Sequence, residues 1–443
     1  MKKIDKKMWA LHNWVGLYAG VVIAVLSITG VAALFKVEID EALNAKLFKV
    51  SPQATTVSLT PIIDSLKTVH GAENLLSVRV PKGPGDTWAP FFFIRNSTLS
   101  LKQLEVFIDP YTGKVVGERD VYKSVGYFLR NIHVRLFDGL LGRQIVGLAG
   151  LALLISTITG FWIYGGFMKR QFFGAIRKKN FRVVMADYHK LIGISTLVFN
   201  LMIAITGTWL GLQAYLQPAI VGDRPGIFKV EEKPLTPEED AAYPVDYDKV
   251  YAKTKELFPE LIPAHILLSF DGSRTVSLMG DVARTAFERD SYSITFDKKD
   301  LTEVHRYDIR TASTGDKLFY IQESLHFGDY GGFLLKIFYA FFGTTSGFLA
   351  LTGFIVYLKR TERGRKEKPK FVALKPLLLR WSYGLLSYIG VLFVLHSFFG
   401  MMVPTILTVV LLYLSLIFLL IRALVLFIKK RFFKRKIKLT TDA

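Results

Sequence analysis

The chain has 443 residues, of which 51% are hydrophobic and none is cysteine, and its formal net charge is +20. Without cysteine it has no disulfides, thiolate ligands or iron–sulfur clusters, so a redox centre would have to be held by histidine, methionine or tyrosine. The basic residues concentrate in residues 1–7, 168–182, 359–375 and 429–438. These segments alternate with long apolar stretches as the positive-inside rule requires, so we expect lipid and no nucleic acid as a partner.

Uncharged stretches long enough to cross a bilayer core of about 30 Å as one helix occur four times. A fifth stretch, residues 381–421, is too long for one crossing and is interrupted near Gly400 and Pro404, which favours a helical hairpin. The sequence therefore predicts six transmembrane helices, at residues 8–35, 140–168, 188–217, 333–358, 377–399 and 403–428.

The basic loops at 169–187 and 359–376 and the basic tail at 429–443 predict that both termini are cytoplasmic. Two large segments, residues 36–132 and 218–325, would then lie on the other side of the membrane. Each reads as a helix followed by a small antiparallel sheet, and in the first segment a turn is expected at Asp109 to Gly113.

An internal repeat relates the two halves of this arrangement. Aligning His12 with His189 places Gly16 on Gly193 and brings two Ile-Thr-Gly triplets together, at residues 28–30 and 205–207. Aligning His133 with His326 matches Arg143 with Lys336, Gly150 with Gly343, Thr159-Gly160-Phe161 with Thr352-Gly353-Phe354, and Tyr164 with Tyr357. The fold class is therefore an α-helical integral membrane protein in which a unit of span, outer α+β domain and span occurs twice, followed by a helical hairpin.

Four repeat-matched histidines stand at the entrances of spans. A twofold axis along the membrane normal would make His12 face His189 near the cytoplasmic side and His133 face His326 near the outer side. Two imidazoles at equal depth on facing helices are the axial ligands that a planar iron macrocycle requires. A single interfacial histidine is more often an ordinary amphipathic residue, but two matched pairs favour ligands.

Nearby residues extend this hypothesis. Gly16 and Gly193, one turn after their histidines, would leave room for a porphyrin, whereas the Thr-Gly matches suggest close helix packing. Near the outer pair, basic side chains could bind haem propionates, namely Arg130, Arg135, Arg143 and, in the second copy, Lys336. His396 is interpreted as an interface residue, with a substitute iron ligand as the alternative, and His133 could lie on a short interfacial helix.

Three stretches resemble a known family. LHNWVGLYAGVVIAVLSITG and YHKLIGISTLVFNLMIAITG are similar to helices of PepSY-associated transmembrane proteins, and FIDPYTGKVVGE is similar to the strand and turn of a PepSY domain. The resemblance covers roughly residues 8 to 360, although the second outer domain has FDKKDLTE in place of the DPxTG turn. The family includes bacterial iron-regulated inner-membrane proteins and ferric-siderophore reductases, so the resemblance implies two non-covalent b-type haems, each with two histidine ligands, in the bacterial inner membrane.

The resulting hypothesis is a reductase that carries electrons across the membrane to an Fe(III) chelate such as a ferric siderophore. The chain has no flavin or nicotinamide fingerprint, so a quinol or a cytoplasmic reductase would be the donor. One alternative is a non-enzymatic PepSY protein that binds an envelope peptidase or another partner. A second alternative, a metal transporter, is disfavoured because the interiors of the spans contain no Asp or Glu.

Overall fold

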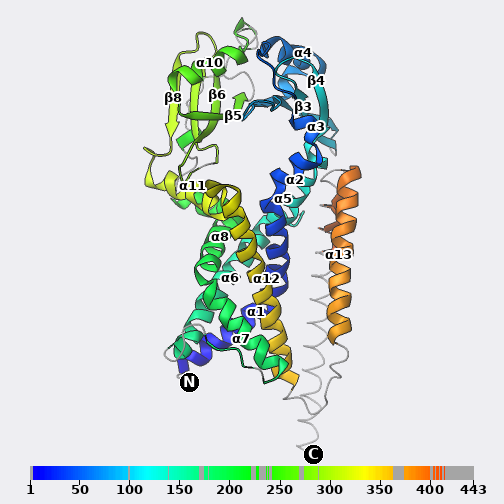
Figure 1. Cartoon of the computed structure of the whole chain (residues 1–443), viewed down its shortest axis with the longest axis vertical. Helices are drawn as coiled ribbons and strands as arrows, with labels where there is room; N and C mark the ends of the chain where they lie inside the picture. The colour runs from blue at the N-terminus through cyan, green and yellow to red at the C-terminus, as the bar shows by residue number, and fades with distance from the viewer. Residues whose placement is uncertain are drawn as a thin grey trace, which may run out of the picture.

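The computed structural model describes residues 3–97, 100–137, 139–168, 174–177, 179–220, 226–228, 236, 238, 242–268, 274–287, 289–362, 374–399, 403–404, 406–408, 410–411 and 414. In this part of the chain, a helical bundle carries one β-sheet at its end (Figure 1). Four of the described helices contain a segment long and apolar enough to cross a membrane, namely α1 (Lys3–Leu34), α6 (Gly139–Met168), α8 (Leu197–Ile220) and α12 (Gly332–Glu362). Large apolar side chains such as Trp14, Val198 and Phe341 are exposed on these helices, as lipid-facing residues should be.

The four helices correspond to the first four predicted spans. The third predicted span is divided at Thr196 into α7 (Phe181–Ser195) and α8. The fifth predicted span coincides with α13 (Leu374–Phe399), which lies beside the bundle (Figure 1). Most of the sixth, residues 403–428, lies outside the described residues, as do the tail at 429–443, a part of the basic loop at 169–187 and most of the basic loop at 359–376.

Close backbone contact holds α6 against α8. A Cβ atom on Gly211 would lie 2.2 Å from the Cα of Gly147, so neither position has room for a side chain. Ser27 of α1 joins α12 in another way, by donating to the carbonyl of Gly343 and accepting from the amide of Gly347. Small residues and interhelical hydrogen bonds are the usual means of helix association in lipid.

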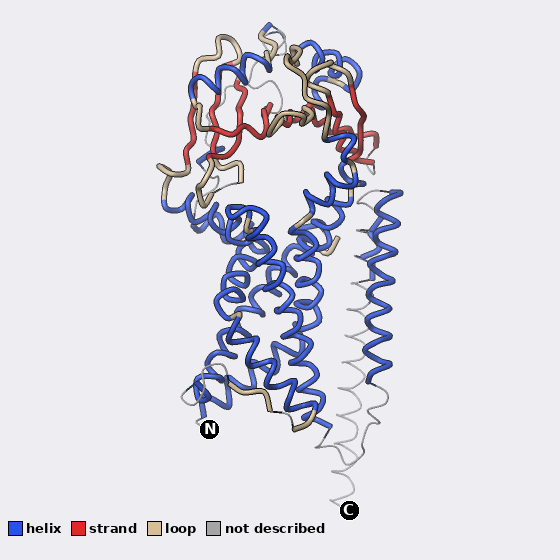
Figure 2. Tube along the Cα trace, in the orientation of Figure 1, coloured by secondary structure: helices blue, strands red, loops and turns tan. Residues whose placement is uncertain are grey.

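A single antiparallel sheet replaces the two small sheets expected from the sequence (Figure 2). Its order is β4-β3-β2-β1-β5-β6-β7-β8, so the first and second sets of four strands meet at β1 and β5, where Val78 pairs with Ile266. The strands are β1 (Leu75–Arg79), β2 (Ala89–Ser97), β3 (Ser100–Ile108), β4 (Val115–Asp120), β5 (Leu261–Leu268), β6 (Thr275–Val282), β7 (Tyr292–Asp297) and β8 (Glu303–Asp308).

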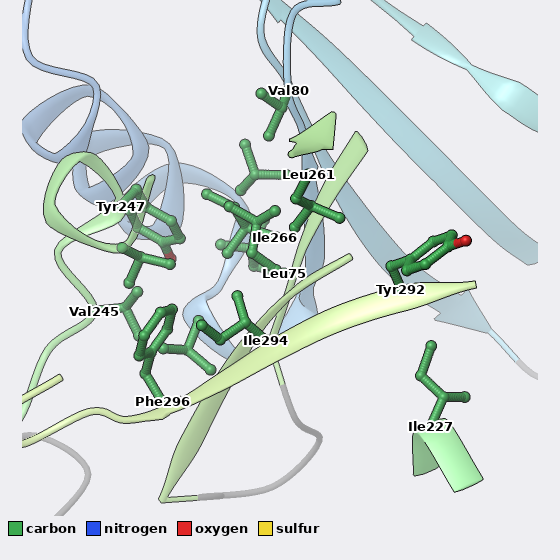
Figure 3. Packing of buried hydrophobic residues seen from close by; sticks show 14 of the residues in the cluster. Leu75, Val80, Ile227, Val245, Tyr247, Leu261, Ile266, Tyr292, Ile294 and Phe296 are labelled. Carbon is green, nitrogen blue, oxygen red and sulfur yellow. The ribbon is translucent and has the colours of Figure 1, made fainter. Parts of the chain in front are cut away.

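One hydrophobic core joins both sets of strands. Helices α4 (Thr60–His70) and α10 (Tyr247–Leu257) cover the face of the sheet that points away from the bundle (Figure 1). Beneath them, Leu75 from β1, Ile266 from β5 and Ile294 from β7 belong to the same buried cluster (Figure 3). The two outer segments therefore fold as one unit.

The predicted turn at Asp109 to Gly113 is present, and the second half of the sheet has the same turn. In the first, Gly113 N donates to Asp109 O, Asp109 N donates to Lys114 O, and Gly113 has a φ of +72°. In the second, Leu301 N donates to Asp297 O, Asp297 N donates to Thr302 O, and Leu301 has a φ of +56°. The missing DPxTG pattern therefore does not change the turn, although a leucine there costs about 1–2 kcal/mol relative to glycine.

Asp248 of α10 caps the N-terminus of α4 in the other half. Its carboxylate accepts from the backbone amides of Leu59 and Thr60, each at 2.9 Å, and from the hydroxyls of Ser58 and Thr60. Burial raises the pKa of Asp248, but these hydrogen bonds outweigh burial and hold that pKa below its ordinary value. The cap therefore links the two halves at the end of the molecule farthest from the bundle.

We expect Asp248→Asn to destabilise the sheet unit by about 1–3 kcal/mol, because an amide donor would face several N–H and O–H donors. Urea unfolding of the detergent-solubilised chain, followed by hydrogen exchange in α4, measures the loss. Asp64→Asn is the matched control, since Asp64 forms only an exposed pair with Lys67 on the same helix.

The effect should depend on pH. Because the folded pKa is depressed, the contribution of Asp248 is present above the unfolded value of about 3.9 and is lost as the pH falls through the folded value. Equal stability of Asp248→Asn and Asp64→Asn at neutral pH would contradict the capping role.

Candidate functional site

Two of the four repeat-matched histidines meet at the end of the bundle far from the sheet. His12 lies on α1 and His189 on α7, and their ring centres are 6.2 Å apart with an angle of 77° between the ring planes. We call them the sheet-distal pair. Helix α7 begins at an Asn180 cap whose side chain accepts from Val183 N, and it ends before Thr196, so His189 lies on a separate short helix at the bundle end.

The other two histidines meet at the end of the bundle nearest the sheet. His133 lies on α5 (Val125–Arg135) and His326 on α11 (Thr314–Phe327), with ring centres 6.3 Å apart and ring planes at 29°. We call them the sheet-proximal pair. Both helices are separate from the spans that follow, as considered for His133 from the sequence.

Left-handed residues separate each of these short helices from its span. Leu136 and Phe137, with φ values of +47° and +62°, follow α5, and Gly328 and Gly332, with φ values of +66° and +63°, follow α11. These residues turn the chain so that α5 and α11 direct their histidines toward each other across the end of the bundle nearest the sheet.

Each of the four histidines makes the same hydrogen bond. Its Nδ1 atom contacts the hydroxyl oxygen of a threonine on a neighbouring helix, in the pairs His12–Thr159 (3.1 Å), His189–Thr352 (3.0 Å), His133–Thr29 (3.3 Å) and His326–Thr206 (2.9 Å). His12 Nδ1 also lies 3.0 Å from the backbone carbonyl of Ser156. All four threonines come from the Thr-Gly pairs found by the sequence alignment.

The hydrogen-bond directions identify the tautomer. Each threonine hydroxyl donates its one hydrogen to the carbonyl four residues earlier in its own helix, at 2.6 to 2.9 Å. The oxygen can then only accept, so Nδ1 of the histidine must carry the proton. At His12 the carbonyl of Ser156 requires the same assignment, because a carbonyl cannot donate. Nε2 of each ring therefore keeps its lone pair, which is the state of a metal-binding imidazole.

The glycine of each Thr-Gly pair touches the same ring. A Cβ atom would approach the histidine Cε1 to 2.8 Å at Gly30, 3.1 Å at Gly160, 3.3 Å at Gly353 and 3.4 Å at Gly207. The distance at Gly30 leaves no room for a methyl group, and the other three are tight. The sequence suggested helix packing for the Thr-Gly pairs, but each pair lies against a histidine ring, and we call each pair a histidine seat. Their recurrence in four spans was the signal that could have identified them.

The predicted glycines next to the ligands have a different environment. A Cβ atom on Gly16 would have no neighbour within 4 Å, and one on Gly193 would reach only Leu349 at 3.8 Å. Space is therefore present beside His12, as the hypothesis of a macrocycle at Gly16 and Gly193 requires.

The basic residues predicted to bind propionates divide into two groups. Arg143 donates to Leu210 O and to Gln213, and Lys336 forms ion pairs with Glu38 at 2.8 Å and Asp329 at 3.5 Å. These protein acceptors would compete with a propionate for Arg143 and Lys336, and propionate binding by the two residues stays a prediction. By contrast, Arg135 Nε is buried without a hydrogen-bond partner, and no ion pair is found for Arg130 within the described residues.

Several basic side chains lie close together near the sheet-proximal pair. Burial and the neighbouring Arg130 and Arg289 lower the pKa of Lys36 to about 8. Burial and the nearby Arg135 likewise lower the pKa of the Arg130 guanidinium. Unpaired positive charge in a partly buried position favours an anionic ligand beside α5.

His396 does not join either histidine pair. Its ring is fully buried, stacks on Tyr127 at 6.0 Å, and its Nε2 donates to the carbonyl of Ser124, the N-cap residue of α5. It therefore attaches α13 to the helix that carries His133. His70, His265 and His305 lie in the sheet unit, on α4, β5 and β8.

One known family matches most of the chain. The sequence matches the family described as PepSY-associated TM region over residues 9–360. No curated protein matches the chain. The match covers all four histidines, all four Thr-Gly pairs and the whole sheet unit, and together with the four apolar helices it makes the chain a multi-pass membrane protein. The chain belongs to the PepSY-associated transmembrane family.

Proposed function

We propose that the protein is a haem-containing membrane reductase that passes electrons through the bundle to an Fe(III) chelate on the side of the sheet. The observation that carries this proposal is the pair of facing imidazoles at each end of the bundle, each with its Nδ1 atom against a threonine hydroxyl. We further propose that the two halves of the chain are repeats related by a twofold axis, which is supported by the matched pairs and by the symmetric strand order.

The residues fit a haem with two histidine ligands. If each Nε2 lies about 2 Å from a shared metal ion, two imidazole centres are roughly 6 Å apart. The measured separations are 6.2 and 6.3 Å. His12 with His189, and His133 with His326, would therefore hold one haem b each, and Arg130 and Arg135 would bind propionates at the sheet-proximal site. A haem whose two axial positions are both filled supplies reversible one-electron transfer.

The positions of the pairs suit transfer across a membrane. On α1, His12 and the seat residue Thr29 are 17 positions apart, which is about 25 Å along the helix axis. One α-helix thus contributes to sites at both ends of the bundle. The chain's own role is to hold four neutral imidazoles in apolar surroundings, to exclude water by helix packing, and to present cations near the sheet-proximal end.

We place the sheet unit outside the cytoplasmic membrane of a bacterium and both termini inside, on the basis of the basic segments. A quinol or a cytoplasmic reductase would supply one electron for each Fe(III) reduced to Fe(II). Hard oxygen-rich chelators such as siderophores bind Fe(II) less strongly, so reduction would release iron.

Spectroscopy of the purified protein tests the cofactor. We expect a reduced-minus-oxidised absorbance spectrum of b-type haem, and His189→Ala or His326→Ala should each remove roughly half of it, because each breaks one pair and spares the other. His305→Ala and His396→Ala are the matched controls and should keep the full signal. Normal size-exclusion behaviour would show that each variant folds.

A spectrum without b-type haem in the native protein would contradict the reductase proposal and favour a PepSY protein that binds an envelope partner. Full retention of haem in both His189→Ala and His326→Ala would mean that other residues are the ligands.

Cysteine labelling tests the orientation. The natural chain has no cysteine, so a single introduced thiol reports without background. We expect Val69→Cys, on the exposed face of α4, to react with a membrane-impermeant maleimide in intact spheroplasts, and Ile176→Cys to react only after permeabilisation. If Ile176→Cys reacts in intact spheroplasts and Val69→Cys reacts only after permeabilisation, the proposed orientation, and with it the proposed direction of electron flow, is wrong.

A further inference from the structure

We propose that the four Thr-Gly pairs are positioning residues that set the electron-donating strength and the orientation of the iron ligands, a proposal that rests on the function proposed above. The pairs are residues 29–30, 159–160, 206–207 and 352–353. Each threonine would control the basicity of one imidazole through Nδ1, and each glycine would leave the space that the same ring needs in its orientation.

The threonine acts through the proton on Nδ1. An imidazole that donates from Nδ1 becomes a stronger electron donor at Nε2, and such a partner also fixes the ring orientation and increases metal affinity. In each seat the threonine hydrogen is committed to its own helix, for example Thr159 to Ile155 O at 2.6 Å. The oxygen is therefore held as an acceptor and does not rotate to become a donor.

The glycine acts by leaving space for the ring edge. At all four seats the nearest ring atom to the position of a glycine Cβ is Cε1, so the four rings are held in the same way. The threonine fixes one edge of the ring by a hydrogen bond, and the glycine leaves the space that the ring edge occupies in this orientation, which a Cβ atom would narrow. Together the two residues determine where Nε2 points.

The seat and the histidine always lie on different helices of the same half of the chain. Thr159 on α6 holds His12 on α1, and Thr29 on α1 holds His133 on α5. In the second half, Thr352 on α12 holds His189 on α7, and Thr206 on α8 holds His326 on α11. Each half thus prepares its own two ligands, and the partner ligand across each pair comes from the other half.

A structural role for the threonines has to be separated from this one, because threonine hydroxyls commonly bond to the preceding turn in membrane helices. Thr157 of α6 and Thr208 of α8 do so as well, bonding to Leu153 O and Ala204 O. Each stands two residues from a seat threonine, and within the described residues neither makes a hydrogen bond to a histidine. They are therefore matched controls for loss of a hydroxyl.

The test uses the full-length holoprotein with two double variants. Thr159→Val with Thr352→Val should weaken haem retention at the sheet-distal pair about 10–100-fold in competition with apomyoglobin, and should raise the midpoint potential of that haem. Thr29→Val with Thr206→Val should do the same only at the sheet-proximal pair. The potential rises because a weaker donor stabilises Fe(III) less, and a tenfold change in the ferric-to-ferrous affinity ratio corresponds to about 59 mV.

Serine restores the acceptor, so the corresponding Thr→Ser variants should return both quantities to near the native values. Gly30→Ala and Gly160→Ala should change the low-spin electron paramagnetic resonance g-values of one haem each by rotating its ligand. Gly165→Ala, where a Cβ atom would meet nothing within 4 Å, should leave both sets of g-values unchanged.

If the seat Thr→Val variants behave like Thr157→Val and Thr208→Val, with unchanged potentials and retention, the threonines are packing residues and the proposal is wrong. If the native protein contains haem, but the seat variants do not change its retention or its midpoint potential, only this proposal is overturned. Absence of haem from the native protein would overturn the proposed function as well.

Discussion

The hydrogen bond from a histidine Nδ1 to a threonine oxygen is the interaction on which both histidine pairs depend. An imidazole among apolar helices has to remain neutral, because a charged ring would lose its hydration without a counter-ion. A neutral ring has one proton, and the surrounding acceptors decide which nitrogen carries it. By accepting at Nδ1, the four threonines leave every Nε2 as the free donor atom. The rest of the bundle serves to bring those atoms into opposition.

Each half of the chain positions its own two histidines, but neither half forms a histidine pair by itself. Each half contains both seats for its own two histidines, but each pair needs one histidine from either half. Site formation therefore depends on how the halves associate. The β1–β5 pairing, the shared hydrophobic core and the Asp248 cap hold them together at the sheet, while α1 packs against α12, and α6 against α8, in the bundle.

The sequence identified the residues whose signal is local or repeated. Apolar length predicted the first four spans, the alignment paired His12 with His189 and His133 with His326, and the Asp109 turn followed from its composition. Features that depend on distant contacts were not predicted. The joining of β1 to β5 needs pairing across nearly two hundred residues, Arg143 is engaged by α8, and Leu301 adopts a left-handed turn that its residue type disfavours.

The most direct test of the account is a density map of the protein purified from its native membrane. We expect a flat macrocycle between the two rings of each pair, with the iron bound to Nε2 of both histidines. Each Nδ1 atom should keep its hydrogen bond to the threonine hydroxyl. Rings turned so that Nδ1 faces the partner histidine, or histidine pairs in direct contact with nothing between them, would contradict it.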